Sequence, residues 1–371
     1  MLELRNNNVF GSIPSELGFL SMLQVFDLRE NELQDSVPES IFNLSQLRLL
    51  YLQKNNRLSG SIPSSIELAT SLEVISFQQC GLDGSLPTTM SKLSNLSFLT
   101  LMDNKLTGSI PADLTKLPLL QVIELSENLL TGTIPDFSGQ SRLYFINLSS
   151  NSLKGKIPTS IGSLPGLLFL DLRKNFIEGS IPASIGQIPN LVTFFASSNL
   201  LTGSIPSFSG NKGKLQAINL SQNNLGGSME AFFDEGAPIS RLLTIDFSSN
   251  LLTSTIPVTV GNFHPLTDLL LKGNQIGGEI PSEIGLLSNL DTLSLAENQL
   301  TGTIPEEMGG MNELIYMDLG NNFLTGEIPD TLSLIPRLAV LDLASNLLTG
   351  EIPVVLSLSE YLGKSFFGSD N

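Results

Sequence analysis

The sequence of 371 residues holds one cysteine, one histidine and no tryptophan. A disulfide within the chain needs two cysteines, and a transition-metal site needs several His or Cys ligands, so the sequence predicts neither. It also lacks a phosphate-binding P-loop, a dinucleotide-binding G-x-G-x-x-G and a hydrolase G-x-S-x-G. We therefore expect a protein that is not an enzyme and that has no catalytic residue, no metal and no cofactor.

Long apolar segments and positive charge are also scarce. No run of 18 apolar residues occurs, and the N-terminus shows no signal-peptide pattern. Residues 1–185 carry 13 Lys or Arg against 17 acids, whereas residues 186–371 carry 6 against 19. An acidic half disfavours nucleic acid and anionic membranes as partners, because phosphate binding needs clustered cations. Two interpretations remain: a solvated acidic surface that favours solubility, or a basic or cation-mediated partner.

One phrase, L-x-x-N-x-L-x-G-x-I-P, recurs about every 24 residues and predicts a solenoid. Its proline falls at Pro14, Pro38, Pro63, Pro87, Pro111, Pro135, Pro158, Pro182, Pro206, Pro257, Pro281, Pro305, Pro329 and Pro353, with Glu230 in one further copy. Each copy starts with a short extended segment, such as 122–125 or 169–172, in which alternate residues are apolar. One copy cannot bury its own leucines, so we expect neighbouring copies to stack as a parallel sheet.

An asparagine closes almost every extended segment, and it predicts an interior ladder of amides. The ladder residues are Asn7, Asn31, Asn55, Asn104, Asn128, Asn151, Asn175, Asn199, Asn223, Asn250, Asn274, Asn298, Asn322 and Asn346. An amide both donates and accepts, so it can satisfy backbone groups of its own and the adjacent coil. Cys80 occupies this position in the fourth copy, where we expect a buried structural thiol.

Over residues 2–353 the sequence resembles the plant-type leucine-rich repeat. The resemblance lies in the phrases LTGSIP, LTGTIP and LTGEIP and in the return phrase at 161–164. The resemblance implies an α/β solenoid, a right-handed leucine-rich repeat superhelix of about 15 repeats. Its parallel β-sheet would line the concave face, and irregular or 3-10 segments the convex side. We expect one solenoid domain, 1–353, with its N-terminal cap missing, and a tail, 354–371, that leads into an absent C-terminal cap.

The resemblance also implies binding. Such arrays form ectodomains of receptor-like kinases and receptor-like proteins, so we expect a non-catalytic, extracellular or cell-surface module that binds a protein or peptide. A membrane would be reached only through a segment absent from this chain. One alternative is a freestanding secreted protein similar to polygalacturonase inhibitors. A further alternative is ice binding through a hydroxyl ladder that Lys156, Glu279, Glu327 and Glu351 interrupt, at Ser61, Ser85, Ser109, Thr133, Ser180, Ser204, Thr255 and Thr303.

The outward strand positions of the first half form an apolar column that predicts a ligand site on the concave face. The column is Val25, Leu49, Val74, Phe98, Val122, Phe145 and Phe169. We expect a ligand to contact Tyr51, Phe98, Phe145, Phe169, Asp171, Arg173, Lys174 and Phe195. The alternative is structural, because aromatic and β-branched residues favour strands and pack across neighbours.

Two further features remain open at this point. Four N-x-S/T sequons, at Asn43, Asn95, Asn147 and Asn219, are possible glycosylation sites. Between Asn223 and Asn250 the repeat is three residues longer than usual, and residues 231–235 are expected to form a short helix or a protruding loop.

Overall fold

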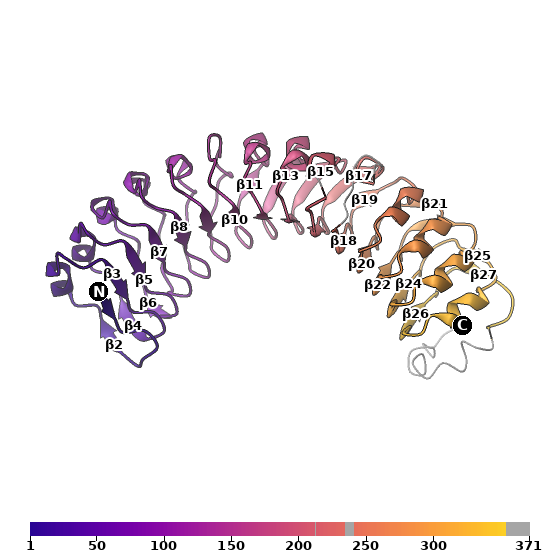
Figure 1. The fold of residues 1–371 in the computed structure, drawn as a ribbon, viewed down its shortest axis with the longest axis horizontal. Helices are drawn as coiled ribbons and strands as arrows, with labels where there is room; N and C mark the ends of the chain where they lie inside the picture. Colours follow the sequence, from indigo (N-terminus) through magenta and orange to yellow (C-terminus); the bar gives the residue numbers. More distant parts are fainter. Residues whose placement is uncertain (212, 234–240, 354–371) are drawn as a thin grey trace. The chain divides into compact units, whose positions relative to one another are not determined.

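The computed structural model describes residues 1–211, 213–233 and 241–353. They divide between Glu178 and Gly179 into two compact units, and each unit is a stack of similar coils. The expected tail, 354–371, lies outside the described residues. Within each unit the main-sheet strands run along one side and the 3-10 turns along the opposite side (Figure 1).

The first unit contains a parallel sheet with one short strand from each coil. In order these strands are β1 (Leu2–Glu3), β3 (Val25–Asp27), β5 (Leu49–Tyr51), β7 (Val74–Ser76), β8 (Phe98–Thr100), β9 (Val122–Glu124), β10 (Phe145–Asn147) and β12 (Phe169–Asp171). The sheet strands in the second unit follow the same rule. They are β14 (Thr193–Phe195), β16 (Ala217–Asn219), β18 (Thr244–Asp246), β20 (Asp268–Leu270), β22 (Thr292–Ser294), β24 (Tyr316–Asp318) and β26 (Val340–Asp342).

Shorter strands follow the ladder asparagine in many coils and pair in smaller parallel sheets. In the first unit these are β2 (Phe10–Ser12), β4 (Glu32–Asp35), β6 (Arg57–Leu58) and β11 (Lys154–Gly155), while β13 (Phe176–Ser180) begins in the first unit and ends in the second. In the second unit they are β15 (Leu200–Gly203), β17 (Asn224–Gly227), β19 (Leu251–Leu252), β21 (Gly277–Glu279), β23 (Gln299–Thr301), β25 (Thr325–Gly326) and β27 (Leu347–Leu348).

All helical segments among the described residues are short 3-10 turns. They are η1 (Ser15–Phe19), η2 (Glu39–Asn43), η3 (Ser64–Leu68), η4 (Thr88–Lys92), η5 (Ala112–Lys116) and η6 (Thr159–Ser163), then η7 (Ala183–Gln187), η8 (Ser209–Asn211), η9 (Val258–Asn262), η10 (Ser282–Leu286), η11 (Glu306–Gly310) and η12 (Asp330–Leu334). A proline with φ between −60° and −75° precedes each turn except η8. The fixed φ of proline suits the start of a helical turn, where a missing N–H costs nothing.

The core of each unit comes from the inward strand residues and from the leucines and isoleucines around them. Phe26, Leu50, Leu99, Ile146 and Leu170, at the centres of the first unit's strands, are fully buried. The predicted alternation is therefore confirmed, although the strands predicted at 122–125 and 169–172 each end one residue earlier. In each unit, the predicted α/β solenoid of parallel strands and 3-10 turns is also confirmed.

Asn151 shows how the amide ladder joins one coil to the next. Its Nδ2 donates to the carbonyl of Leu148 in its own coil at 3.2 Å and to that of Leu125 in the preceding coil at 3.0 Å. Its Oδ1 accepts the N–H of Leu130 at 2.9 Å. The same pattern recurs at Asn128 and Asn298, among others. Each amide therefore satisfies buried backbone groups that neighbouring coils leave without strand partners.

The residue before each ladder asparagine adopts a left-handed backbone conformation. Its φ lies between 53° and 59° at every non-glycine example, including Glu30, Lys54, Glu127 and Lys174. Only Gly273 supplies the glycine that this conformation favours. Non-glycine residues hold it at a cost of about 1 kcal/mol or more, which the adjacent amide bonds must offset.

Cys80 fits the ladder without an amide, as the sequence predicted. The thiol is buried and donates to the Leu52 carbonyl at 3.1 Å. The Leu58 N–H, which an amide at position 80 would receive, instead bonds to the Asn55 carbonyl at 2.9 Å. Burial raises the pKa of the Cys80 thiol to about 12, so a reactive thiolate is not available at neutral pH.

The longer repeat after Asn223 contributes to the core. Phe232 and Phe233 are buried, and Phe232 packs edge-to-face on Phe208 at 5.6 Å and on Phe247 at 5.1 Å. The described part of the predicted helix or loop, 231–233, is thus a turn whose rings fill the interior, and the expectation that it protrudes is wrong there. The remainder, 234–235, lies outside the described residues.

Replacing Asn151 by Ala should lower the free energy of unfolding by about 1–3 kcal/mol, because the buried Leu130 N–H loses its acceptor and the Leu125 carbonyl loses one of its two amide donors. Urea unfolding followed by circular dichroism measures the change. Asn7→Ala is the matched control, since Asn7 holds the same ladder position but is exposed, and its side-chain amide donates to Leu4 and Arg5 of its own coil. Equal losses in the two variants would contradict the assigned role of the ladder.

Cys80 should not react with a thiol reagent such as DTNB in the native protein at pH 8, because its raised pKa and burial both suppress the thiolate. In guanidinium chloride the same thiol should react within seconds. Rapid labelling of the native protein would show that this coil opens readily.

Candidate functional site

The predicted apolar column lies on the outward face of the first unit's sheet. Phe98 pairs with Val122, Val122 with Phe145 and Phe145 with Phe169 in the strand register. Each side chain therefore stands beside the next at the spacing of adjacent parallel strands, about 4.8 Å. The column is half-buried, and Val122 is only 9 % exposed. The sequence predicted this alignment correctly but not the partial burial.

Phe145 and Phe169 form a stacked aromatic pair on this face. Their ring centroids lie 4.5 Å apart and the ring planes differ by 5°, so the rings are stacked. Stacking along the sheet directs the ring edges, which carry the positive end of the aromatic quadrupole, toward solvent. The pair is a rigid apolar platform, since each ring restricts the rotation of the other.

A row of polar side chains lies beside the aromatic column, at the next outward position of the same strands. Glu124, Asn147 and Asp171 are neighbours in register. Oε2 of Glu124 accepts a hydrogen bond from the Asn147 amide at 2.9 Å, and Oε1 accepts bonds from the Ser126 N–H at 3.0 Å and hydroxyl at 2.5 Å. Burial raises the pKa of Glu124, and the nearby Asp171 charge raises it further, although these hydrogen bonds oppose the shift.

Asp171 and Arg173 form an ion pair at the edge of this row. Nη2 of Arg173 lies 2.6 Å from Oδ2 of Asp171, and Nε contacts both carboxylate oxygens at 3.0 Å. The Asp171 side chain is 1 % exposed, whereas that of Arg173 is 40 % exposed. Asp171 thus holds the guanidinium in one orientation, and the Arg173 side chain stays partly exposed to solvent. Lys174 follows in the left-handed position and is exposed.

The other predicted site residues lie elsewhere. Tyr51 is on β5, with β7 between it and Phe98, and the Arg29 guanidinium lies 5.1 Å from its ring centroid. Phe195 is half-buried on β14 and belongs to the second unit. The structure therefore brings together Phe98, Phe145, Phe169, Asp171, Arg173 and Lys174. We call this group, together with Glu124 and Asn147, the aromatic face.

Sequence reasoning did not identify Glu124 as part of this face. A carboxylate at an outward strand position is ordinary, and its burial depends on the neighbouring column and on Asn147. A signal was present in the spacing, because Asn147 and Asp171 follow Glu124 at the repeat interval.

The four sequons differ in their surroundings. Asn43, at the end of η2, and Asn95 are exposed, and the Asn95 amide donates to the Thr70 carbonyl at 2.9 Å. Asn147 and Asn219 are half-buried on the sheets, where each Oδ1 accepts bonds from the serine two residues later. The Asn147 Nδ2, the atom a glycan would modify, already bonds Glu124.

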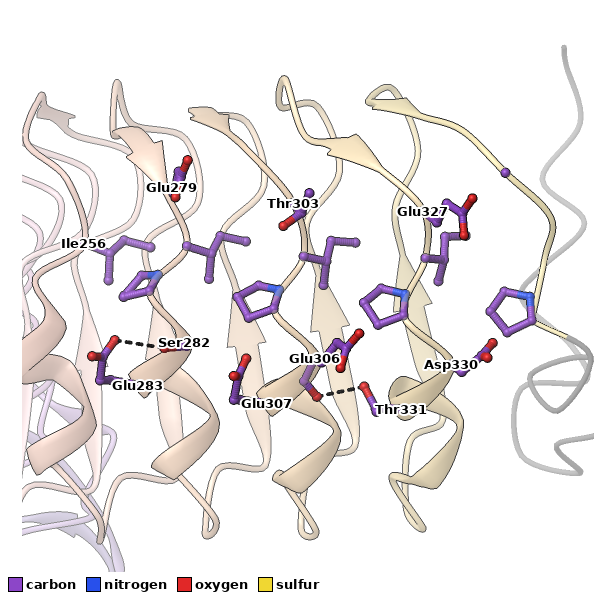
Figure 2. A pocket seen from close by; sticks show the side chains of 18 of the residues that line it. Ile256, Glu279, Ser282, Glu283, Thr303, Glu306, Glu307, Glu327, Asp330 and Thr331 are labelled. Atoms are coloured by element: carbon purple, nitrogen blue, oxygen red, sulfur yellow. Dashed lines mark hydrogen bonds between the residues drawn. The ribbon is translucent and has the colours of Figure 1, made fainter.

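The second unit carries a separate groove of about 1390 Å³ along the Ile-Pro phrases of successive coils (Figure 2). Its floor includes Ile280, Ile304 and Pro305. Seven carboxylates line it: Glu279, Glu283, Glu306, Glu307, Glu327, Asp330 and Glu351. We call this feature the acidic groove; the sequence showed the acidic half of the chain but not its concentration here.

The described residues form no metal-binding cluster and no membrane-spanning helix. Residues 1–211, 213–233 and 241–353 contain no group of three or more His, Cys, Asp or Glu arranged to hold a metal ion. Within the same ranges, none of the helices has both the length and the apolar character needed to cross a bilayer.

Comparison with known proteins identifies the family. Models described as leucine-rich repeat region and leucine rich repeat match residues 1–105, 142–164 and 287–348. The Arabidopsis receptor kinase HAESA, solved with the peptide hormone IDA and the co-receptor SERK1, is 30 % identical with a TM-score of 0.68. The match covers 97 % of this chain and 72 % of that one. The chain belongs to the leucine-rich repeat family.

Other solved leucine-rich repeat proteins are similar over nearly the whole chain. The ectodomain of the receptor kinase GASSHO1/SCHENGEN3 from Arabidopsis thaliana, solved with CASPARIAN STRIP INTEGRITY FACTOR 2, is 32 % identical with a TM-score of 0.67. The match covers 95 % of this chain but 48 % of that one, so the chain spans about half of that relative. The leucine-rich repeat protein LIC12759 of Leptospira interrogans is 29 % identical with a TM-score of 0.70. That match covers 94 % of this chain and 90 % of that one. No curated protein matches significantly.

Replacing Glu124 by Gln should flatten the dependence of stability on pH. A folded-state pKa above the ordinary value of 4.5 means that the folded protein binds the proton more tightly than the unfolded chain. This contribution to stability is present at low pH and is lost as pH rises from about 4.5 through the raised pKa. Between pH 4.5 and 7.5 the free energy of unfolding should therefore fall more in the wild type than in Glu124→Gln. Urea unfolding of both proteins at several pH values measures the difference. Parallel curves would show that burial does not shift this carboxyl.

Proposed function

We propose that this leucine-rich repeat chain is the ligand-recognition region of an extracellular receptor-like protein or receptor-like kinase. A peptide or a protein segment would lie across the strands of the first unit, on the aromatic face. The observation that carries the proposal is the stacked Phe145–Phe169 pair next to the held Arg173 guanidinium. No catalytic role is assigned to any residue of this face.

The chemistry of the aromatic face suits recognition of an extended segment. The stacked rings provide apolar area at little entropic cost, because their rotamers are already restricted. Arg173 and the exposed Lys174 offer donors for a carboxylate or carbonyl of the ligand, and Asn147 offers a second polar contact in the same row. An apolar anchor bordered by oriented polar groups is the usual composition of a binding hot spot.

The solved relatives support the same interpretation. HAESA was solved with a peptide hormone, and the GASSHO1/SCHENGEN3 ectodomain was solved with CASPARIAN STRIP INTEGRITY FACTOR 2. Those partners belong to those proteins, and the ligand of this chain is proposed only as a class, a peptide or protein segment.

The second candidate is a freestanding secreted protein that binds another protein. What supports it is that one solved relative, LIC12759, is described as a leucine-rich repeat protein and not as a receptor kinase. Sequencing the transcript beyond both ends distinguishes the two: a transmembrane segment downstream supports the receptor, and a stop codon after a short cap supports the freestanding protein.

Replacing Phe145 and Phe169 together by Ser should weaken ligand binding strongly with little loss of stability. Peptides that bind the full chain are first selected from a displayed library of random 12-residue sequences, and their affinities are then measured by calorimetry. We expect at least a tenfold loss in the double variant, because the apolar anchor disappears. The melting temperature should fall by less than about 5 °C, since both rings are already half-exposed and their stacking adds only about 0.5–1.5 kcal/mol to the effect of the area that they bury.

The control is Val25→Ser with Leu49→Ser, which alters the same column outside the aromatic face. It should leave peptide affinity unchanged. A large drop in melting temperature for the phenylalanine variant would mean that the column is structural. Equal loss of binding in the control variant would locate the ligand elsewhere.

A further inference from the structure

The acidic groove of the second unit has walls of one charge. Figure 2 shows Glu279, Thr303 and Glu327 on one side of the Ile-Pro row, and Glu283, Glu306, Glu307 and Asp330 on the other. None of the residues that line the groove is Lys, Arg or His. The nearby cations pair with acids outside the groove. Within 241–353, Lys272 pairs with Glu297 at 3.3 Å and Asp318 at 3.4 Å, and Arg337 pairs with Glu313 and Asp291. Across the described ranges, no groove carboxylate forms an ion pair.

The fold does not require these charges. The Ile-Pro phrase of the first unit is preceded by Ser61, Ser85 and Ser109, where the second unit has Glu279 and Glu327. Glu327 and Glu351 lie on adjacent coils, and like charges there repel, so these carboxylates cost stability relative to serine. Placement in the first turn of a 3-10 segment favours an acid such as Glu307, but it does not account for Glu279 or Glu327, which precede the turn.

Glu279 and Glu327, which lie above the Ile-Pro row in Figure 2, are held in position by close packing. A Cβ on Gly302 would lie 2.7 Å from Cγ of Glu279, and one on Gly350 would lie 2.7 Å from Cγ of Glu327. Each glutamate stem thus rests on a glycine of the next coil, which fixes the base of its side chain along the groove.

A second, apolar hollow of about 550 Å³ adjoins the side of the groove that carries Glu283, Glu306 and Glu307. It lies where Gly310 replaces the leucine found at the same position of the coils on either side, Leu286 and Leu334. These leucines are 55 % and 68 % exposed. Two exposed leucines with a glycine between them leave room for one apolar side chain, and Glu283 and Glu307 border that space.

We propose that the acidic groove docks a cationic, extended segment of a partner protein, with its Lys or Arg side chains between the two carboxylate walls and one apolar side chain over Gly310. Charge complementarity selects the cations, since the groove supplies unpaired carboxylates and no positive charge. The hollow selects an apolar side chain next to them, and the Ile-Pro floor suits an extended backbone. This surface is distinct from the aromatic face and does not depend on the function proposed for it.

The test uses the full chain and three synthetic heptapeptides, with affinities measured by calorimetry at low and physiological salt. The first is Lys-Pro-Lys-Leu-Lys-Pro-Lys, in which proline keeps the backbone extended. The second has Ser in place of Leu, and the third has Glu in place of every Lys. We expect the first to bind at least fivefold more tightly than the second, the third not to bind, and affinity to weaken with salt.

The charge requirement is tested with Glu283→Gln, Glu307→Gln and Glu327→Gln combined, which should weaken the lysine–leucine peptide at least tenfold. The matched control neutralises three exposed acids of the first unit: Glu16→Gln, Asp83→Asn and Glu178→Gln. Glu16 bonds the preceding serine as Glu283 does, so local structure is matched. Equal weakening in the control would mean that only net charge attracts the peptide, and it would overturn the proposal.

The apolar requirement is tested with Gly310→Leu. A Cβ at this position meets no atom closer than 3.7 Å, so the leucine is accommodated and fills the hollow. We expect the preference for the leucine peptide over the serine peptide to disappear, with unchanged affinity for the latter. A preference that survives the substitution would overturn the assigned hollow. Saturable binding of Ca²⁺ without peptide binding, or dimerisation through the groove in light scattering, would show a different occupant and also overturn the proposal.

Discussion

The stacking of coils depends on how backbone groups are satisfied at the end of each strand. The chain turns sharply there, and the N–H and C=O groups that it leaves inside have no strand partner. In every coil but that of Cys80, one asparagine amide supplies both a donor and an acceptor, as at Asn151. Because each amide bonds backbone in its own and in the preceding coil, the position of one coil determines that of the next within a unit.

This arrangement separates stability from recognition. Inward strand residues such as Ile146 and Leu170 are fully buried and set the spacing, whereas outward residues of the same strands only need to fit beside one another. The outward column therefore tolerates Val122 next to Phe145 without a change in backbone. A binding face can be assembled by substitutions that leave the core intact, which is why the phenylalanine pair can serve recognition at little cost in stability.

The periodic features were predictable from the sequence, and the exceptions to the period were less so. Aligning the repeats was enough to align Phe98, Phe145 and Phe169 and to place Cys80 in the asparagine ladder. The left-handed residue before each asparagine was not predicted, because only Gly273 marks it by residue type. The packing of side chains from one coil on those of the next was not predicted either. The burial of Glu124 depends on such contacts, which the spacing of the repeats alone does not specify.

The acidic groove was also only partly predictable from the sequence. Glu279 and Glu327 are visible in the sequence as interruptions of a serine and threonine ladder, but only the structure places them opposite Glu283 and Glu307 across an apolar floor. Because the coils repeat at 24-residue intervals, carboxylates on adjacent coils, such as Glu283 and Glu307 or Glu327 and Glu351, line up into a charged wall that threonines interrupt. Repulsion within that wall is the energetic reason to expect a cationic partner, since association would relieve a cost that folding alone leaves in place.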